Sequence, residues 1–176
     1  MTWLRDRTGC SVMQKGKPMF RKMRRFKQQL SEEECISILK TEPRGVLSVF
    51  GEDGYPYGMP VNHFYDDETG NIYFHGAGEG HKIDAIRKCD KVSLCVYDKG
   101  FRREGDWALN IKSVIVFGRI RIVENRERTV EVLRKLGLKH YPDAESVERE
   151  IRKDAARATC LEMTIDHMTG KLVNES

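Results

Sequence analysis

Residues 71–86 read Asn-Ile-Tyr-Phe-His-Gly-Ala-Gly-Glu-Gly-His-Lys-Ile-Asp-Ala-Ile. An apolar run ends at His75, three glycines follow, and the apolar residues from Ile83 onward have helical spacing. This order predicts a strand, a glycine turn and a helix with His81 and Lys82 in its first turn. Helix N-termini bind anions through free N–H groups and the helix dipole, so we predict a phosphate site. The alternative is an exposed basic pair beside a flexible loop.

The sequence on both sides of this segment predicts an antiparallel sheet. Turn residues at Asp53-Gly54 and at 66–70 connect strands too closely for crossover helices, which argues against a Rossmann fold. We predict six strands, over residues 46–50, 55–65, 72–75, 92–97, 113–123 and 158–166. Six antiparallel strands suffice for a small barrel whose ends are covered by helices.

Helix signals separate these strands. Ser31 and Glu34 form a capping-box pattern before a helix that Pro43 ends. A later helix from Arg126 is expected to stop at Gly137, a C-cap signal, and a further helix follows Pro142. The chain is then expected to turn at residues 167–170.

Composition limits the class of protein. The 176 residues carry a formal charge of +4, which is too balanced to indicate nucleic-acid binding. Five scattered cysteines without a CxxC pair indicate reduced thiols, and no run is long enough to span a membrane. We expect a cytoplasmic protein with residues 1–21 as a flexible basic tail and residues 22–176 as one domain. The tail's basic run could contact RNA or lipid, but a solvated arm is favoured.

Several other residues are candidates for a site. His75 is either a core histidine or a hydrogen-bonding group beside a ring-shaped ligand. The neighbouring strand carries Met59-Pro-Val-Asn62, where Pro60 interrupts the ladder and Asn62 offers a donor and an acceptor. Asp66 and the next residue lie in a turn without a histidine cluster, so we expect solvated carboxylates and no metal.

The motifs together resemble a known family. They are Gly45-Val-Leu-Ser, Asp53-Gly-Tyr-Pro-Tyr, Pro60-Val-Asn, Ile72-Tyr-Phe-His-Gly-Ala, Gly80-His-Lys-Ile-Asp-Ala-Ile, Ser113-Val-Ile-Val-Phe-Gly-Arg and Thr169-Gly-Lys. In this order they resemble the pyridoxamine 5′-phosphate oxidase-like, flavin-binding split-barrel superfamily, and most of all its nitroimidazole-resistance (Nim) proteins. The resemblance covers roughly residues 22–172.

The resemblance implies a six-stranded antiparallel split β-barrel with flanking helices, and a homodimer with FMN, or FAD, between its subunits. It implies that the flavin contacts Met59, Pro60, Val61, Asn62, Phe74, His75, Gly76, Ala77, His81, Lys82, Ser113 and Val114. His75 would be the catalytic residue, and the substrate a nitro-aromatic or similar small molecule. A non-catalytic flavin- or haem-binding module with a sensing or storage role is the alternative.

The chain departs from the family pattern at two places. His81 stands where many relatives have arginine beside the phosphate-binding lysine, so phosphate affinity is expected to depend on pH. The arginine and lysine pair of true pyridoxamine phosphate oxidases is missing from the strand before the turn, where Met59 and Asn62 stand. Vitamin B6 oxidation is therefore not the expected reaction.

Overall fold

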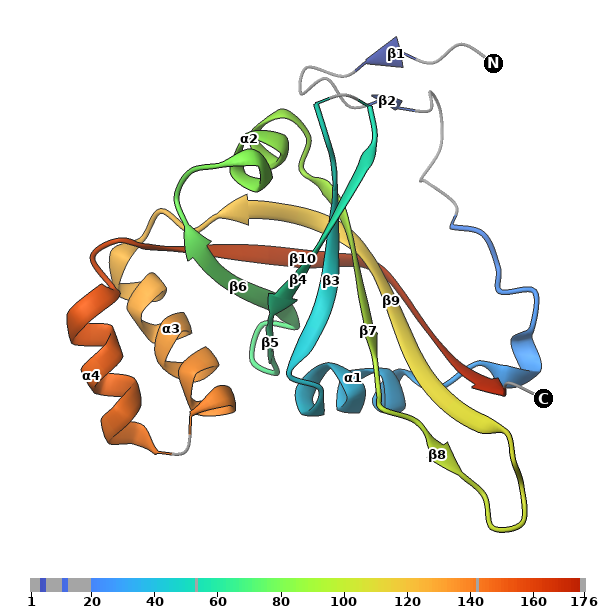
Figure 1. The fold of residues 1–176 in the computed structure, drawn as a ribbon. Helices are drawn as coiled ribbons and strands as arrows, with labels where there is room; N and C mark the ends of the chain where they lie inside the picture. The colour runs from blue at the N-terminus through green and yellow to red at the C-terminus, as the bar shows by residue number, and fades with distance from the viewer. Residues whose placement is uncertain (1–3, 6–10, 13–19, 53, 142, 175–176) are drawn as a thin grey trace.

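The computed structural model describes residues 4–5, 11–12, 20–52, 54–141 and 143–174 (Figure 1). Most of the predicted N-terminal tail, residues 1–21, lies outside these ranges, and its flexibility stays a prediction. Two short strands of this region, β1 (Leu4–Arg5) and β2 (Ser11–Val12), pair antiparallel.

The main sheet is antiparallel and curls into a half-barrel (Figure 1). Its strand order is β4-β3-β7-β9-β10-β6-β5, and β8 pairs with β9. The strands are β3 (Arg44–Phe50), β4 (Pro56–Asn62), β5 (Phe64–Asp66), β6 (Asn71–Ala77), β7 (Lys91–Tyr97), β8 (Phe101–Arg102), β9 (Leu109–Ile122) and β10 (Ala158–Asn174). The predicted split barrel with flanking helices is confirmed. The predicted strand over residues 55–65 is divided at His63 into β4 and β5. The strand predicted from residue 113 begins earlier, at Leu109, and the short strand β8 was not predicted.

The predicted end of the last strand is also wrong. The expected turn at residues 167–170 does not form, because β10 continues beside β9 to Asn174. A register shift between Ile165 and His167 absorbs the irregular sequence, as a β-bulge does.

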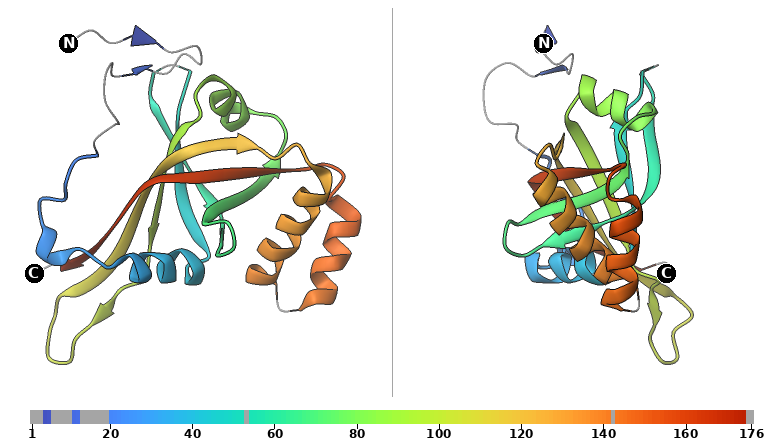
Figure 2. Two further views of the ribbon diagram at one scale, coloured as in Figure 1. Left: turned by 180° about the vertical axis from the view of Figure 1, so that it is seen from behind. Right: turned by 90° about the vertical axis from the view of Figure 1, so that its left-hand side faces the viewer.

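The helices close the barrel and cover one of its edges. A short 3₁₀ helix, η1 (Phe26–Gln28), precedes α1 (Glu32–Thr41), which lies across one end of the barrel (Figures 1 and 2). The predicted capping box is confirmed, since Ser31 and Glu34 exchange hydrogen bonds of 3.0 and 3.2 Å. At the opposite end, α2 (His81–Lys88) follows the glycine turn. The pair α3 (Arg126–His140) and α4 (Ala144–Asp154) forms a hairpin beside β6 and β10.

The prediction that α3 stops at Gly137 is wrong. The helix continues to His140, and Gly137 faces α4. A Cβ atom at this position would lie 2.8 Å from the Val147 Cγ1 atom, so this glycine permits close helix packing instead of ending the helix.

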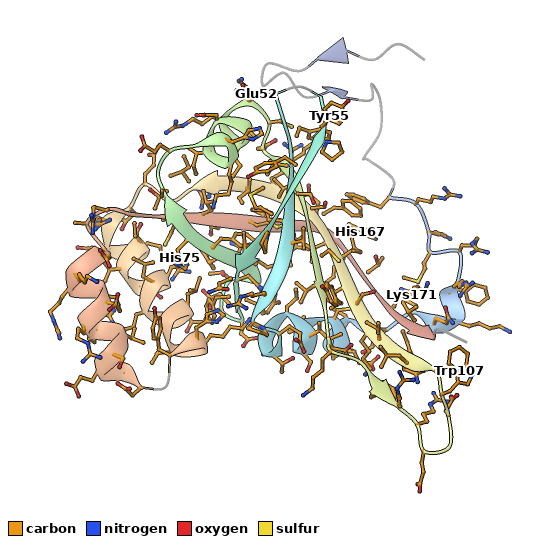
Figure 3. All side chains as sticks on the ribbon, viewed as in Figure 1. Glu52, Tyr55, His75, Trp107, His167 and Lys171 are labelled. Atoms are coloured by element: carbon orange, nitrogen blue, oxygen red, sulfur yellow. The ribbon has the colours of Figure 1, made fainter. Side chains whose placement is uncertain are left out.

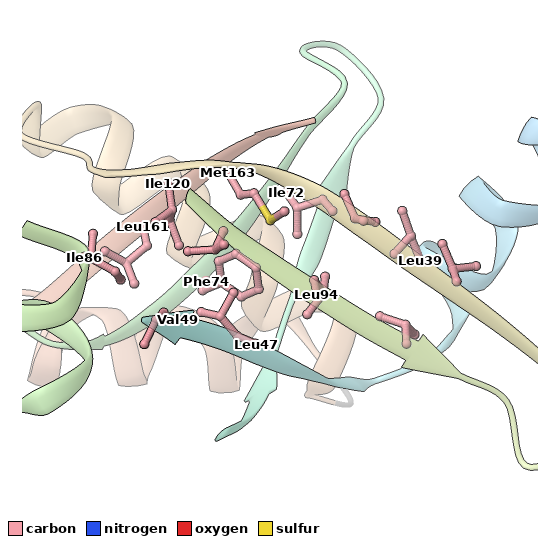
Figure 4. Packing of buried hydrophobic residues seen from close by; sticks show 14 of the residues in the cluster. Leu39, Leu47, Val49, Ile72, Phe74, Ile86, Leu94, Ile120, Leu161 and Met163 are labelled. Atoms are coloured by element: carbon pink, nitrogen blue, oxygen red, sulfur yellow. The ribbon is translucent and has the colours of Figure 1, made fainter. Parts of the chain in front are cut away.

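Two clusters of buried side chains hold these layers together. The larger fills the barrel with residues from the inner sides of the strands and from α1 and α2, including Leu39, Leu47, Phe74, Leu94 and Met163 (Figure 4). The smaller cluster lies on the outer side of β6 and β10, where Tyr73, Cys160 and Val132 join the sheet to α3. The α3–α4 hairpin is therefore fixed against the strand that leads into the glycine turn.

The expectation of reduced thiols is confirmed for Cys35, Cys95 and Cys160 and is wrong for Cys89, which takes part in a disulfide. None of the helices in the described part of the chain combines the length and apolar character needed to cross a membrane.

Candidate functional site

The glycine turn leads into an uncapped helix N-terminus. Gly80 is the N-cap residue of α2 and has a φ of +106°, a conformation that side-chain-bearing residues rarely adopt. No side chain accepts a hydrogen bond from the first turn of α2. The N–H groups of Ile83 and Asp84 donate to the Gly80 carbonyl at 2.8 and 3.1 Å, so the N–H groups that precede them in this turn are the ones that could bind an anion.

Lys82 brings a cation to this turn. A Cβ atom on Gly76 would lie 3.0 Å from Lys82 Nζ, so the absence of a side chain at the end of β6 makes room for the ammonium group. Burial lowers the pKa of Lys82. No carboxylate of the described residues forms a salt bridge with it. Burial removes water from the ammonium group, and no carboxylate compensates for this loss. A bound anion would supply the missing favourable interaction with the lysine charge.

His81 contacts the β3–β4 hairpin. Its ring stacks on the Tyr57 ring with centroids 4.3 Å apart and an interplanar angle of 12°. Glu52, at the tip of the same hairpin, forms an ion pair with Lys88 at the other end of α2 (Figure 3). These contacts attach the helix to the hairpin and leave His81 exposed at the N-terminus of α2.

The side chain of His75 lies on the face of β6 opposite to that of its neighbours Phe74 and Gly76. Phe74 is fully buried in the barrel, so the alternation of side chains places His75 on the outer face, toward the α3–α4 hairpin (Figure 3). His75 stays exposed to solvent in this chain, and partial burial, followed by the nearby charge of Lys82, lowers its pKa. The imidazole is therefore neutral at pH 7 and can donate or accept a hydrogen bond.

A cavity of about 230 Å³ opens beside His75. Asn62 from the end of β4 lines it with His75, so the structure brings two of the predicted residues together. The opposite wall comes from α3, α4 and the residues next to them and is mainly apolar, with His140, Tyr141, Glu150 and Asp154 as polar members.

The other residues of β4 and β6 have different surroundings. Met59 and Val61 pack against the barrel core, while Pro60 is exposed on β4, which is the edge strand that its proline predicted. Asn62 Oδ1 accepts a hydrogen bond of 3.3 Å from Arg44 Nε. Ala77, the last residue of β6, is exposed at the start of the turn.

Ser113 and Val114 lie far from the turn within this chain. Ser113 pairs with Tyr97 and with Lys171, whereas Ile122, at the other end of β9, pairs with Leu161 opposite β6. Nine residues of strand separate Ser113 from Ile122, about 30 Å at 3.3 Å per residue. Val114 is fully buried, whereas Ser113 lies on the outer side of the sheet.

The polar groups around α3 were not predicted from the sequence. His140 lines the cavity, and its Nε2 atom is buried without a hydrogen-bond partner. His63 is fully buried, and Lys139 donates to the carbonyl oxygens of Leu39 and His63 at 3.0 and 3.1 Å. These residues come from elements distant in sequence, so no local motif announces them.

The described residues contain no cluster of three or more side chains suited to a metal ion. Asp66 was expected to be solvated and is buried instead, with Arg128 2.9 Å from its carboxylate. Tyr73 and Glu162 extend this group of polar contacts beneath α3, since the Tyr73 hydroxyl donates to Glu162 at 2.8 Å. The network joins β5, β6, β10 and α3 and has a structural role.

Solved structures of other proteins share this fold. A candidate 5-nitroimidazole antibiotic resistance protein from Bacteroides thetaiotaomicron has 18% identity and a TM-score of 0.68 over 83% of this chain and 87% of its own. An FAD-binding protein from Mesorhizobium loti has 26% identity and a TM-score of 0.59 over 83% and 97%. An FAD- and heme-binding protein from Mycobacterium smegmatis has 19% identity and a TM-score of 0.67 over 85% and 74%.

A search of curated proteins found no match. A family model described as pyridoxamine 5′-phosphate oxidase matches residues 31–172, from the cap of α1 to the last strand. This range includes the glycine turn, Lys82, His75 and the cavity. The chain belongs to this pyridoxamine 5′-phosphate oxidase family.

Proposed function

We propose that the protein binds a flavin, FMN in preference to FAD, and reduces small nitro-aromatic or similar molecules. Lys82 carries this proposal, because its half-buried ammonium lies beside Gly76 at an uncapped helix N-terminus without a carboxylate partner. That arrangement suits a phosphate group. A bound flavin would supply the redox chemistry, and the chain would supply binding, orientation and electrostatics.

Relatives of different kinds support a flavin. The proteins from Mesorhizobium loti and Mycobacterium smegmatis are FAD-binding, and the Bacteroides protein is linked to nitroimidazole resistance. We do not extend the reaction in the family's name to this chain. The strand before the turn lacks the basic pair that the resemblance to true pyridoxamine phosphate oxidases would require, and Met59 and Asn62 stand nearby.

We assign His75 the role of substrate anchor. Its ring lines the cavity beside Asn62, and its lowered pKa keeps it neutral at pH 7. A neutral imidazole can hold a polar group of the substrate by a hydrogen bond. It can transfer its one ring proton to the substrate only if its other ring nitrogen takes up a proton.

The outer face of the sheet supports a homodimer. Phe50, Tyr97 and Phe117 project from this face of β3, β7 and β9 and are 58%, 57% and 40% exposed. Between them lie small or apolar side chains such as Val46 and Cys95. Apolar faces of this kind mark protein interfaces. Pairing of two copies through it would carry the outer face of β9, with Ser113, toward the site of the other subunit.

A flavin titration tests the proposal. Protein freed of bound cofactor is titrated with FMN, FAD and riboflavin, and binding is followed by flavin fluorescence and the visible spectrum. We expect Lys82→Ala to weaken FMN binding by about 10- to 100-fold, since a charged hydrogen bond to phosphate is lost, and to leave riboflavin binding unchanged. Lys88→Ala, on the same helix, is the matched control. Absence of flavin binding, or equal FMN affinity in the Lys82 variant, contradicts the proposal.

A non-catalytic flavin or haem module is the second candidate, favoured by the similarity to an FAD- and heme-binding protein. Steady-state oxidation of NADH or NADPH with a nitro-aromatic acceptor separates the two. If the wild type shows turnover, and His75→Ala shows less turnover at unchanged FMN affinity, the protein is an enzyme. Tight cofactor binding without turnover supports the module.

A further inference from the structure

The cavity between β6 and the α3–α4 hairpin has a buried polar group that has no hydrogen-bond partner among the described residues. The Nε2 atom of His140 is buried and has no hydrogen-bond partner, and His140 lines the cavity. Burial is the main cause that lowers the pKa of His140, and the backbone of His63 opposes this shift. A backbone carbonyl can only accept a hydrogen bond, so it favours the tautomer that carries the proton on Nδ1. Nε2 of the neutral ring is then an acceptor that needs a donor from a ligand.

The rest of the lining defines the ligand further. Leu133, Leu136 and Ile151 form an apolar wall, suited to a flat ring. Glu150 contributes a carboxylate and has no salt-bridge partner among the described residues. Asp154 adds a second carboxylate, although Arg157 lies 2.6 Å from it. The lining therefore disfavours anions.

We propose that this cavity is the substrate site and that it selects small aromatic heterocycles that are uncharged or cationic and carry an N–H donor. His140 accepts from the N–H group, His75 and Asn62 contact the opposite side of the ring, and Glu150 excludes carboxylate-bearing analogues. His140 and Glu150 are then specificity-determining residues. This inference rests on the proposed function, which makes the bound molecule a substrate. Binding of the molecule in the cavity does not itself require a flavin.

Benzimidazole, 1-methylbenzimidazole and benzoate are the probes that separate these features. All three are small enough for a cavity of about 230 Å³, but only benzimidazole offers a ring N–H. Binding is measured by calorimetry and by the ring nitrogen signals of His140 in NMR spectra, with and without FMN. We expect benzimidazole to bind at least about tenfold more tightly than its methyl derivative, and benzoate not to bind.

Variants test the location. Ile151→Trp fills the cavity and is expected to weaken benzimidazole about tenfold or more. Leu133→Phe serves the same purpose if the first variant does not fold. Glu150→Gln should allow benzoate to bind, whereas Glu145→Gln, on the first turn of α4 and outside the cavity, should not.

Three results would overturn the inference: benzimidazole does not bind, it binds no more tightly than 1-methylbenzimidazole, or it binds to Ile151→Trp and Leu133→Phe as tightly as to the wild type. The outcomes for the two proposals are distinct. If benzimidazole binds and FMN does not, the ligand site in the cavity stands and the proposed flavin function fails. If FMN binds and benzimidazole does not, the flavin function stands and the ligand site fails.

Discussion

The Nζ atom of Lys82 lies 3.0 Å from the position that a Cβ atom on Gly76 would occupy. The penultimate residue of strand β6 is thus a glycine, and its missing side chain leaves room for the ammonium group of Lys82 from α2. This contact joins the C-terminal part of a strand to the first turn of the next helix.

Gly76→Ala should reduce FMN affinity by about tenfold, because the added methyl group displaces the ammonium nitrogen from its place above the strand. The displaced atom is the end of a flexible side chain, so the free energy of unfolding should change by less than about 1 kcal/mol. Flavin titration and urea denaturation measure the two effects. In the double variant Gly76→Ala/Lys82→Ala, the alanine at 76 should cause no further loss. An additive second loss would show that Gly76 acts independently of the lysine.

Gly137→Ala should destabilise the protein. In an open helix this change adds about 1 kcal/mol of stability, but here the new methyl group would lie 2.8 Å from Val147 Cγ1. Overpacking typically costs about 1–3 kcal/mol, so the free energy of unfolding should fall by about 1 kcal/mol. Urea denaturation measures it. Adding Val147→Ala should recover the loss from overpacking, and a stabilised single variant would refute the packing explanation.

These two glycines show what could be predicted from the sequence. The glycine turn and the capping box of Ser31 are local patterns, and both were predicted correctly because their physics acts within a few residues. Gly137 satisfies the local rule for a helix end, but contact with Val147 from another helix overrides it. A local pattern cannot reveal a neighbour that only the fold supplies.

The residues of the candidate site also divide into those that a local sequence pattern indicates and those that only the fold brings together. Lys82 and His75 belong to one continuous segment and were found from it. His140 and Glu150 were not found, because they reach the cavity only after α3 and α4 fold back on β6. Ser113 was assigned by resemblance alone, and its position on the far part of β9 makes that assignment depend on a second subunit.

Phe117→Glu should convert the proposed dimer to a monomer. Phe117 is 40% exposed on the outer face of the sheet, and a carboxylate there would be buried against the other copy without a partner. Sedimentation or light scattering gives the mass, and circular dichroism confirms folding. Phe26→Glu is the control, because Phe26 is exposed on η1 and outside this face. An unchanged mass in the Phe117 variant, or a monomeric native protein, argues against the interface.

His63 should make the fold sensitive to acid. It is fully buried, its Nε2–H donates to the Leu39 carbonyl at 2.8 Å, and its Nδ1 has no partner. Burial, followed by the charge of Lys139, lowers the pKa of His63 to about 3 from 6.5. As the pH falls below 6.5 the unfolded chain takes up a proton that the folded chain refuses. The free energy of unfolding should therefore decrease from pH 6.5 down to about pH 3.

His63→Leu tests this prediction, because leucine does not titrate and Lys139 still donates to the Leu39 carbonyl. The difference in unfolding free energy between wild type and variant should change with pH only in the acid window, by at most about 5 kcal/mol. Lys139→Met should make the acid window narrower without removing it, because the charge of Lys139 is the second cause of the lowered pKa of His63, after burial. It should also remove a separate alkaline effect, since burial lowers the pKa of Lys139 to about 8 from 10.5 and the folded form loses that proton first. Parallel acid profiles for wild type and His63→Leu would show that His63 titrates normally in the folded protein.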